Sequence, residues 1–230
     1  MQPSLKPFDQ RLQLAIRLII PVSILLLLII VLQYPPALSS GGLLGLIGAS
    51  GILLVYGYLA LGSPIAVGKP SGEVWRRGAV LGMISGIVLS VDLISSYFLQ
   101  DWIISSRTSL LAYGIFLLFI LISGFIGARQ TGQWKTGLTT AAWCVLVTLM
   151  IWFFAEFASY LLFSNTSSGA EFIRQEMQLD FARSGATDYQ AFTISDFYGA
   201  GFFHLLLGLF FTVILGSLGA FIGLATRPKR

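Results

Sequence analysis

The sequence predicts an all-α, polytopic membrane protein, a transmembrane helical bundle of six spans with both termini in the cytoplasm. Three observations predict it: an apolar composition, six long apolar segments, and an uneven distribution of basic residues between the loops. Of the 230 residues, 56% are hydrophobic and 10% are charged, whereas about 25% of the residues in a typical soluble domain are charged. This composition excludes an ordinary water-soluble fold.

Six apolar segments come close to the length of about 20 residues that a spanning helix needs. We expect a single membrane domain over 1–230, with spans at about 18–34, 42–62, 78–99, 108–128, 137–163 and 197–225 and an outer loop at 164–196. The first segment follows Lys6, Arg11 and Arg17, so it also resembles a signal peptide, whose cleavage would leave five spans in the same orientation. We favour six spans, because the run is long for a signal peptide and is flanked by Pro35 and Pro36.

Basic residues gather in alternate loops, and the positive-inside rule turns this bias into an orientation. Of the 14 Lys and Arg residues, eleven fall on the side of both termini and three on the other side. The eleven are Lys6, Arg11, Arg17, Lys69, Arg76, Arg77, Arg129, Lys135, Arg227, Lys229 and Arg230; the three are Arg107, Arg174 and Arg183. We therefore expect a multi-pass protein of a cytoplasmic-type cell membrane, with both termini inside.

Small residues recur every four positions in two of the predicted spans. Gly78, Gly82 and Gly86 form one ridge, and Gly208 and Gly216 belong to another. Because lipid tails compete with any apolar side chain, helices associate in a bilayer through close backbone approach and van der Waals fit. We expect these glycines in buried seams, either within one chain or against a membrane-protein partner or a second copy. The glycine-rich second span is expected inside the bundle for the same reason.

The outer loop between the fifth and sixth spans has the pattern of an extracytoplasmic amphipathic helix. Ser168 and Glu171 have the spacing of a capping box, and Gly185 suits a left-handed C-terminal cap. Apolar residues recur at helical spacing between them: Phe172, Ile173, Met177 and Phe181. Their face either covers the bundle or membrane surface or docks a partner, and we favour the first. Ser195 or Asp196 is expected to cap the last span.

Three side chains inside the predicted spans can readily ionise near neutral pH or below, namely Asp92, Glu156 and His204. A charge at mid-bilayer costs about 2.5 to 3.5 kcal/mol on insertion scales, so such residues usually face the bundle interior or water and mark functional sites. At 1.5 Å per residue, all three lie roughly 10 to 12 Å from the outer ends of their helices. We favour separate roles, with Glu156 hydrated, Asp92 neutral and His204 bonded to a carbonyl. The alternative is one shared, outward-facing protonatable site.

The segment Gly48-Ala49-Ser50-Gly51 matches the GxSG motif of rhomboid proteases, which have six spans and a histidine on a later one. The resemblance covers these four residues and His204, and it implies an intramembrane serine hydrolase with a Ser50–His204 dyad. The motif lies in the second span rather than the fourth, and Gly and Ser also serve as packing contacts. The hydrolase is therefore the alternative hypothesis.

The leading hypothesis is a non-enzymatic integral membrane protein, either an accessory subunit or a small transporter. We expect no cofactor, since the sequence has no cofactor fingerprint, and no metal, since one histidine and the single Cys144 cannot form a usual ligand set. The formal charge of +4 is dispersed over short loops and forms no basic stripe. The expected partners are the lipid bilayer and a membrane protein or second copy, rather than nucleic acid.

Overall fold

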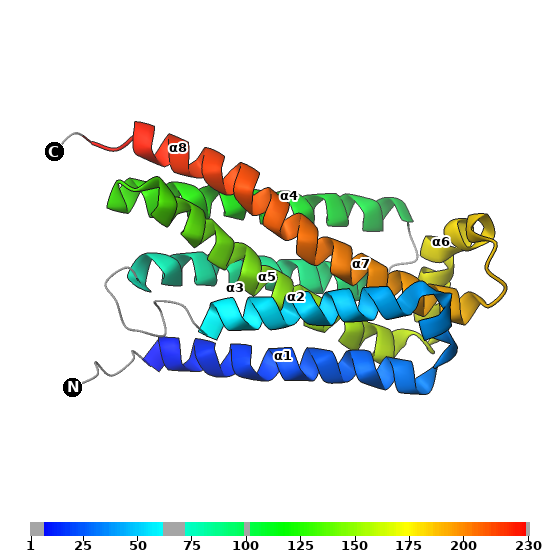
Figure 1. Ribbon diagram of the computed structural model, residues 1–230. Helices are drawn as coiled ribbons and strands as arrows, with labels where there is room; N and C mark the ends of the chain where they lie inside the picture. Colours follow the sequence, from blue (N-terminus) through cyan, green and yellow to red (C-terminus); the bar gives the residue numbers. More distant parts are fainter. Residues whose placement is uncertain (1–6, 62–71, 99–101, 229–230) are drawn as a thin grey trace.

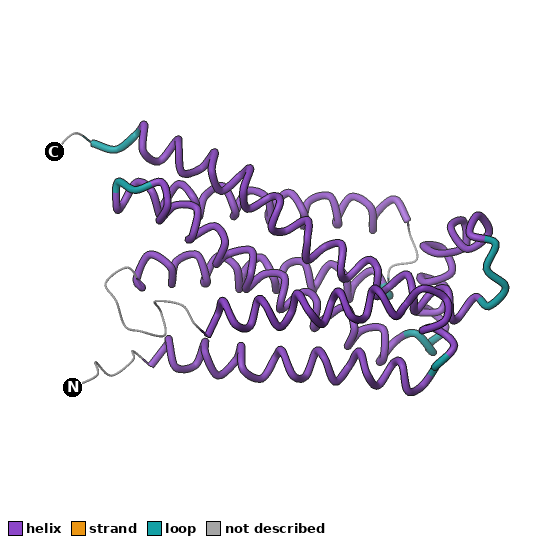
Figure 2. The backbone as a smooth tube through the Cα atoms, viewed as in Figure 1, coloured by secondary structure: helices purple, strands orange, loops and turns teal. Residues whose placement is uncertain are grey.

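The computed structural model describes residues 7–61, 72–98 and 102–228, and all of the regular elements in them are helices. In chain order they are α1 (Pro7–Gln33), the π-helical turn η1 (Leu38–Gly42), α2 (Leu43–Leu61), α3 (Gly72–Ser96), α4 (Trp102–Thr131), α5 (Trp134–Phe163), α6 (Ser167–Ser184), α7 (Tyr189–Phe211), the π-helical turn η2 (Thr212–Gly216) and α8 (Ser217–Ala225). The predicted all-helical class is confirmed. Long helices run side by side, and α6 lies across one end (Figure 1 and Figure 2).

Among the described residues, four helices are long and apolar enough to cross a membrane. These are Arg76–Ser96, Ser106–Thr131, Trp134–Phe163 and Tyr189–Ala225, and shorter apolar stretches are Arg17–Gln33 and Leu43–Leu59. Large apolar side chains cover the outside of the bundle; for example, Leu32 and Leu44 are 78% and 79% exposed. A contiguous apolar surface of this kind is rare on soluble monomers. The chain is therefore a membrane protein.

α5 is the central helix of the bundle. In its most apolar window 72% of the residues are buried, against 33% to 39% in the other three long apolar helices. α3 and α4 make their largest contacts with α5, and the last helix packs on α4 and α5. The position of every other long helix is therefore set relative to α5.

The expectation that α2 lies inside the bundle is wrong. α2 packs on α1 and α7 at the rim, and it exposes large apolar residues that include Leu44, Ile47 and Tyr58. Its glycines lie in two seams: a Cβ on Gly45 would lie 2.9 Å from the Tyr198 backbone of α7, and one on Gly57 would overlap the Ile20 side chain of α1. Glycine density therefore marked close contacts with two neighbouring helices and not full burial.

The glycine ridge of α3 faces α5. A Cβ added to Gly78, Gly82 or Gly86 would overlap α5 atoms, and at Gly82 the obstacle is the backbone carbonyl of Cys144. The Thr148 hydroxyl donates a hydrogen bond of 3.1 Å to the Gly82 carbonyl across the same seam. Close backbone approach and an interhelical hydrogen bond are two ways in which helices associate in lipid.

The second glycine ridge lies on α7 and η2. A Cβ on Gly208 would overlap the Leu149 side chain of α5, and one on Gly216 would lie 2.7 Å from the Cβ of Ala141. The Gly216 carbonyl in turn faces Gly124 of α4. Gly216 therefore occupies the point where α4, α5 and the last helix meet.

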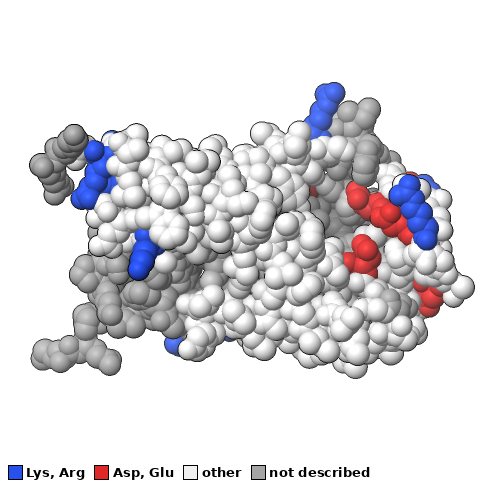
Figure 3. All heavy atoms as spheres, turned by 45° about the horizontal axis from the view of Figure 1, so that its top comes forward, with Lys and Arg blue, Asp and Glu red and all other residues white. Residues whose placement is uncertain are grey.

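The two ends of the bundle carry opposite charges. Acidic side chains gather at the end that carries α6, called here the α6 end, and arginines lie at the opposite end, called the terminal end because Pro7 and Arg227 lie there (Figure 3). Three arginines, Arg107, Arg174 and Arg183, belong to the α6 end. Other charged residues lie outside the described residues: Lys6, Lys69, Asp101, Lys229 and Arg230.

The N-terminal cap of α6 differs from the predicted one. Thr166 is the cap, and its hydroxyl oxygen accepts a hydrogen bond of 3.1 Å from the Gly169 N–H. The predicted capping box of Ser168 and Glu171 is wrong, because Glu171 pairs with Arg174 at 2.7 Å. This pairing lowers the pKa of Glu171 to about 2.

The connection from α6 to α7 follows the prediction at one end only. Gly185 ends α6 in the left-handed conformation with φ 72°, as predicted. α7 begins at Tyr189 with Asp188 as its N-cap, so the expected cap at Ser195 or Asp196 is wrong. The last long helix starts earlier than its apolar segment does, because polar residues can occupy the helical turns that lie beyond the hydrocarbon core.

Replacing Gly82 with alanine should destabilise the bundle, because the new Cβ would push α3 away from the Cys144 carbonyl. We expect the unfolding free energy to fall by about 1 to 3 kcal/mol, the usual cost of overpacking. Thermal unfolding in detergent, followed by circular dichroism, measures this. Gly114→Ala is the matched control, since a Cβ at Gly114 of α4 has no neighbour within 4 Å. Equal unfolding midpoints for the two variants would contradict the importance of the seam.

Candidate functional site

A cavity of about 300 Å³ opens at the α6 end between α3, α4, α5 and α6. Two carboxyl groups line it, Asp92 and Glu176, together with serines of α3 and α4 and the rings of Tyr113, Trp152 and Phe172. The described residues that line it include no Lys, Arg or His. Figure 3 shows the surface hollowed beside the acidic residues at this end. We call this space the acidic cavity.

Asp92 lies one turn before the end of α3. Its Oδ1 atom is buried and has no hydrogen-bond partner among the described residues. The neighbouring hydroxyls of Ser95 and Ser96 donate to the Asp92 backbone carbonyl, at 2.8 and 3.0 Å. A buried carboxylate oxygen without a hydrogen-bond partner is costly, and a bound cation removes that cost. The Asp92 carboxyl can therefore act as a receptor for positive charge.

Glu176 was missed as a site residue, because the sequence shows it only as one polar position on an amphipathic helix. α6 brings it to the cavity by packing its apolar face on the bundle end, where the Phe172 and Tyr97 rings lie 4.8 Å apart. Partial desolvation there raises the pKa of Glu176. Its spacing of four residues from Phe172 is the signal that could have indicated this placement.

His204 lies behind two walls of the acidic cavity. Its Nδ1 atom donates to the Ala200 carbonyl at 2.8 Å, and its Nε2 atom lies 3.5 Å from the Tyr113 hydroxyl. Its ring centroid is 4.7 Å from that of Trp152. Tyr113 and Trp152 also line the cavity. These two aromatic side chains therefore lie between Asp92 and His204.

Glu156 lies on α5 one turn beyond Trp152. It is 5% exposed, and its Oε2 atom has no hydrogen-bond partner among the described residues. It does not line the acidic cavity, although Tyr113 lies within electrostatic reach of both Glu156 and Asp92. The three predicted residues thus gather around Tyr113 and Trp152, and Asp92 alone of the three opens into the cavity.

Ser50 lies on α2 and His204 lies on α7, and the face of α7 that contacts α2 is not the face that carries His204. The α7 face toward α2 carries Phe202, whose ring a Cβ on Gly48 would overlap, and the Leu205 carbonyl, which accepts from the Tyr56 hydroxyl of α2. His204 instead faces α4 and α5 through its contacts with Tyr113 and Trp152. The structure does not bring the rhomboid-like pair together.

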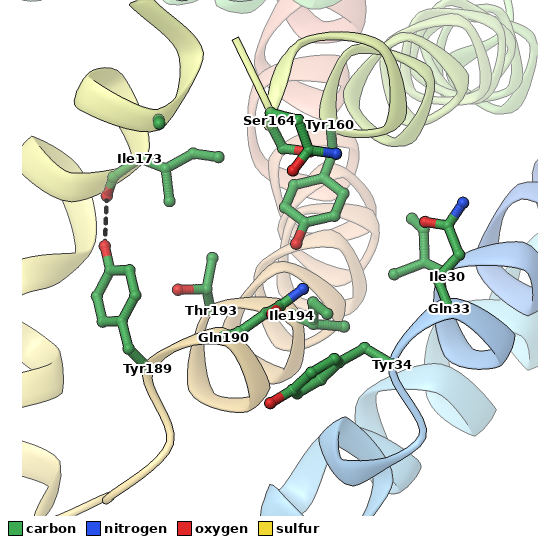
Figure 4. Close-up of a pocket in the computed structure, with 12 residues that line it drawn as sticks. Ile30, Gln33, Tyr34, Tyr160, Ser164, Ile173, Tyr189, Gln190, Thr193 and Ile194 are labelled. Carbon is green, nitrogen blue, oxygen red and sulfur yellow. Dashed lines mark hydrogen bonds between the residues drawn. The ribbon is translucent and has the colours of Figure 1, made fainter. Parts of the chain in front are cut away.

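A second cavity at the α6 end, of about 260 Å³, lies between α1, α5, α6 and α7, and none of the described residues that line it is charged. Figure 4 shows the side chains of Tyr160 and Thr193 directed into it. The Oγ1 atom of Thr193 is buried without a described partner, and the Tyr189 hydroxyl donates to the Ile173 carbonyl at 3.2 Å. This neutral cavity can hold water or an uncharged hydrogen-bonding group, and its lining supplies no carboxyl, amine or imidazole for acid–base chemistry.

Comparison with known proteins adds no functional assignment. No protein-family model, curated protein or solved structure matches the chain. Among the described residues, no group of three or more His, Cys, Asp and Glu side chains is placed to hold a metal ion. The proposed function therefore depends on the chemistry of the residues that line the cavities.

Asp188 ties the end of α1 to the start of α7. Its Oδ2 atom accepts a hydrogen bond of 2.6 Å from the Tyr34 hydroxyl, and its Oδ1 atom accepts one of 2.9 Å from the Ala191 N–H. These bonds lower the pKa of Asp188, with the Ala191 bond first in importance. A lowered carboxyl pKa means that the stabilisation is present above the ordinary value of 3.8 and is lost as the pH falls through the lower folded value.

Asp188→Asn should therefore loosen the start of α7 at neutral pH, because the amide forms weaker bonds than the carboxylate. We expect amide hydrogen exchange over residues 189–194 to become several-fold faster, and its acid dependence to weaken. Asp180→Asn, on an exposed part of α6, is the control and should leave exchange in this segment unchanged. Identical exchange in the wild type and Asp188→Asn would contradict the role of the carboxylate.

Proposed function

We propose that this chain is a non-enzymatic, six-span integral membrane protein of the cell membrane that binds a small cation in the acidic cavity and acts as a small transporter. One observation carries the proposal: Asp92 and Glu176 line one cavity, and the described residues of its lining include no Lys, Arg or His. In the proposed orientation the α6 end faces outward and both termini are cytoplasmic.

The proposed topology draws support from helix length and charge. α2 has 19 residues, which at 1.5 Å per residue gives about 28 Å, close to the hydrocarbon thickness of about 30 Å. α1 has 27 residues and runs beside α2 (Figure 1). The arginine-rich terminal end is the one that the positive-inside rule assigns to the cytoplasm.

The lining of the acidic cavity favours an organic cation. Carboxylates attract positive charge, and the aromatic rings of Trp152, Tyr113 and Phe172, which line the cavity, are of the kind that attracts cations. The cavity volume of about 300 Å³ suits a small ammonium compound. Behind this lining, Glu156 and His204 continue a layer of protonatable groups into the bundle, so uptake of a solute can be coupled to proton binding.

Cation binding should quench the fluorescence of Trp152, which lines the acidic cavity. In purified protein, N-methylpyridinium should give a saturable quenching component, and the neutral quencher acrylamide should not. Asp92→Asn should weaken the apparent affinity about tenfold, equivalent to about 1.4 kcal/mol, and Trp152→Phe should remove the saturable component. Asp180→Asn is the matched control, because Asp180 does not line the cavity. Unchanged affinity in Asp92→Asn would contradict the proposed site.

Uptake into proteoliposomes distinguishes the two forms of the non-enzymatic hypothesis, a small transporter and an accessory subunit. A transporter should accumulate tetramethylammonium, and Asp92→Asn should abolish that uptake at equal reconstitution. Saturable binding without uptake, together with a stoichiometric protein partner that co-purifies in mild detergent, would instead assign the chain as an accessory subunit.

Acidification should weaken cation binding, because a protonated carboxyl no longer attracts positive charge. Desolvation raises the pKa of Glu176 above its ordinary value of 4.5, so affinity should be full above the raised value and fall as the pH passes down through it. A pH titration of N-methylpyridinium affinity measures this. Glu176→Gln should remove the part of the pH dependence that lies above 4.5, and an unaltered profile would exclude Glu176 as its source.

A further inference from the structure

A cavity of about 480 Å³ at the terminal end is lined by three arginines from separate parts of the chain. Arg77 belongs to α3, Arg129 to the last turn of α4, and Arg227 to the segment after α8. The described residues that line it include no Asp or Glu. We call this space the arginine cavity; it lies at the opposite end of the bundle from the acidic cavity.

Two of the arginines are positioned by specific contacts. The guanidinium carbon of Arg129 lies 5.4 Å from the centroid of the Phe125 ring, a distance typical of a cation–π contact. The guanidinium of Arg227 fills the space in which Gly132 would carry a side chain, and Gly132 has φ +71°. A glycine there both permits the left-handed turn and leaves room for the guanidinium. The arginine cavity is therefore built by the fold.

The membrane topology alone does not require three arginines to meet around one cavity. The positive-inside rule needs basic residues on one side of the membrane, and separate side chains in water would satisfy it. Three like charges around one space repel one another, and an anion bound between them would relieve that repulsion. Guanidinium groups match phosphate oxygens in paired hydrogen bonds, so the arrangement indicates a phosphate ligand.

We infer that the arginine cavity binds the phosphate group of an anionic phospholipid from the surrounding leaflet. Its wall includes Phe125 and Ile126, which belong to the candidate membrane span Ser106–Thr131. A lipid can place its phosphate among the arginines and its acyl chains against this apolar helix, whereas free phosphate uses only the first contact. Basic pockets between membrane helices recognise anionic headgroups in this way. The inference depends on membrane insertion and is independent of the acidic cavity.

Native mass spectrometry of the full chain in detergent tests the inference with three probes: phosphatidylglycerol, phosphatidylcholine with the same acyl chains, and inorganic phosphate. We expect phosphatidylglycerol to bind about tenfold or more tightly than phosphatidylcholine, and inorganic phosphate to compete weakly. Equal binding of the two lipids would overturn the inference. Inorganic phosphate that competes as well as the anionic lipid would assign the cavity to free phosphate and overturn the lipid source.

Substitutions localise the site. Arg129→Gln should lower phosphatidylglycerol affinity about five- to tenfold, and Arg129→Lys should lower it less, because lysine keeps the charge but loses the paired geometry. Arg183→Gln, at the α6 end, is the control and should not change it. A lipid preference that survives the triple change Arg77→Gln, Arg129→Gln and Arg227→Gln would overturn the inference. Thermal unfolding in detergent, followed by circular dichroism, reports whether each variant is folded without relying on the acidic cavity.

Discussion

Close approach of glycine ridges to the central helix is the constraint on which the rest of the structure depends. In a bilayer, apolar burial does not by itself draw helices together, so association depends on backbone proximity, close fit and a few hydrogen bonds. At Gly82, α3 approaches the Cys144 carbonyl of α5, and the Thr148 hydroxyl bonds across the seam. Gly208 and Gly216 bring the last helix to another part of α5 in the same manner.

The polar groups take their positions from these seams. α3 carries Asp92 to the α6 end, α7 carries His204 behind Tyr113 and Trp152, and α6 places Glu176 over the resulting space. The serine hydroxyls beside Asp92 bond to its backbone carbonyl, which leaves its Oδ1 atom without a described partner. The packing of apolar and small residues thus determines where the carboxyl groups of the site lie, including the Asp92 oxygen that has no described hydrogen-bond partner.

The positions of the helices and of the C-terminal cap of α6 could be predicted from the sequence, because they depend on residues that are close to one another along the chain. Each of the six apolar segments overlaps a helix, although α1, α3, α4 and α7 begin before the predicted span does, and Gly185 ends α6 with the expected left-handed backbone. The rotation of each helix about its axis depends on contacts between distant segments, and spacing alone does not report it. For this reason Ser50 was paired with His204, α2 was placed inside the bundle, and Glu176 was not recognised.

The central position of α5 could not be predicted from the sequence for a related reason. Its buried residues include Thr140, Cys144, Thr148 and Glu156, yet its overall apolar character resembles that of helices at the rim. A membrane helix first enters the bilayer and afterwards associates with other helices. The α5 sequence must therefore satisfy two solvents in succession: hydrocarbon during insertion, which demands Leu, Val and Phe, and protein after assembly, which permits hydroxyl and carboxyl groups.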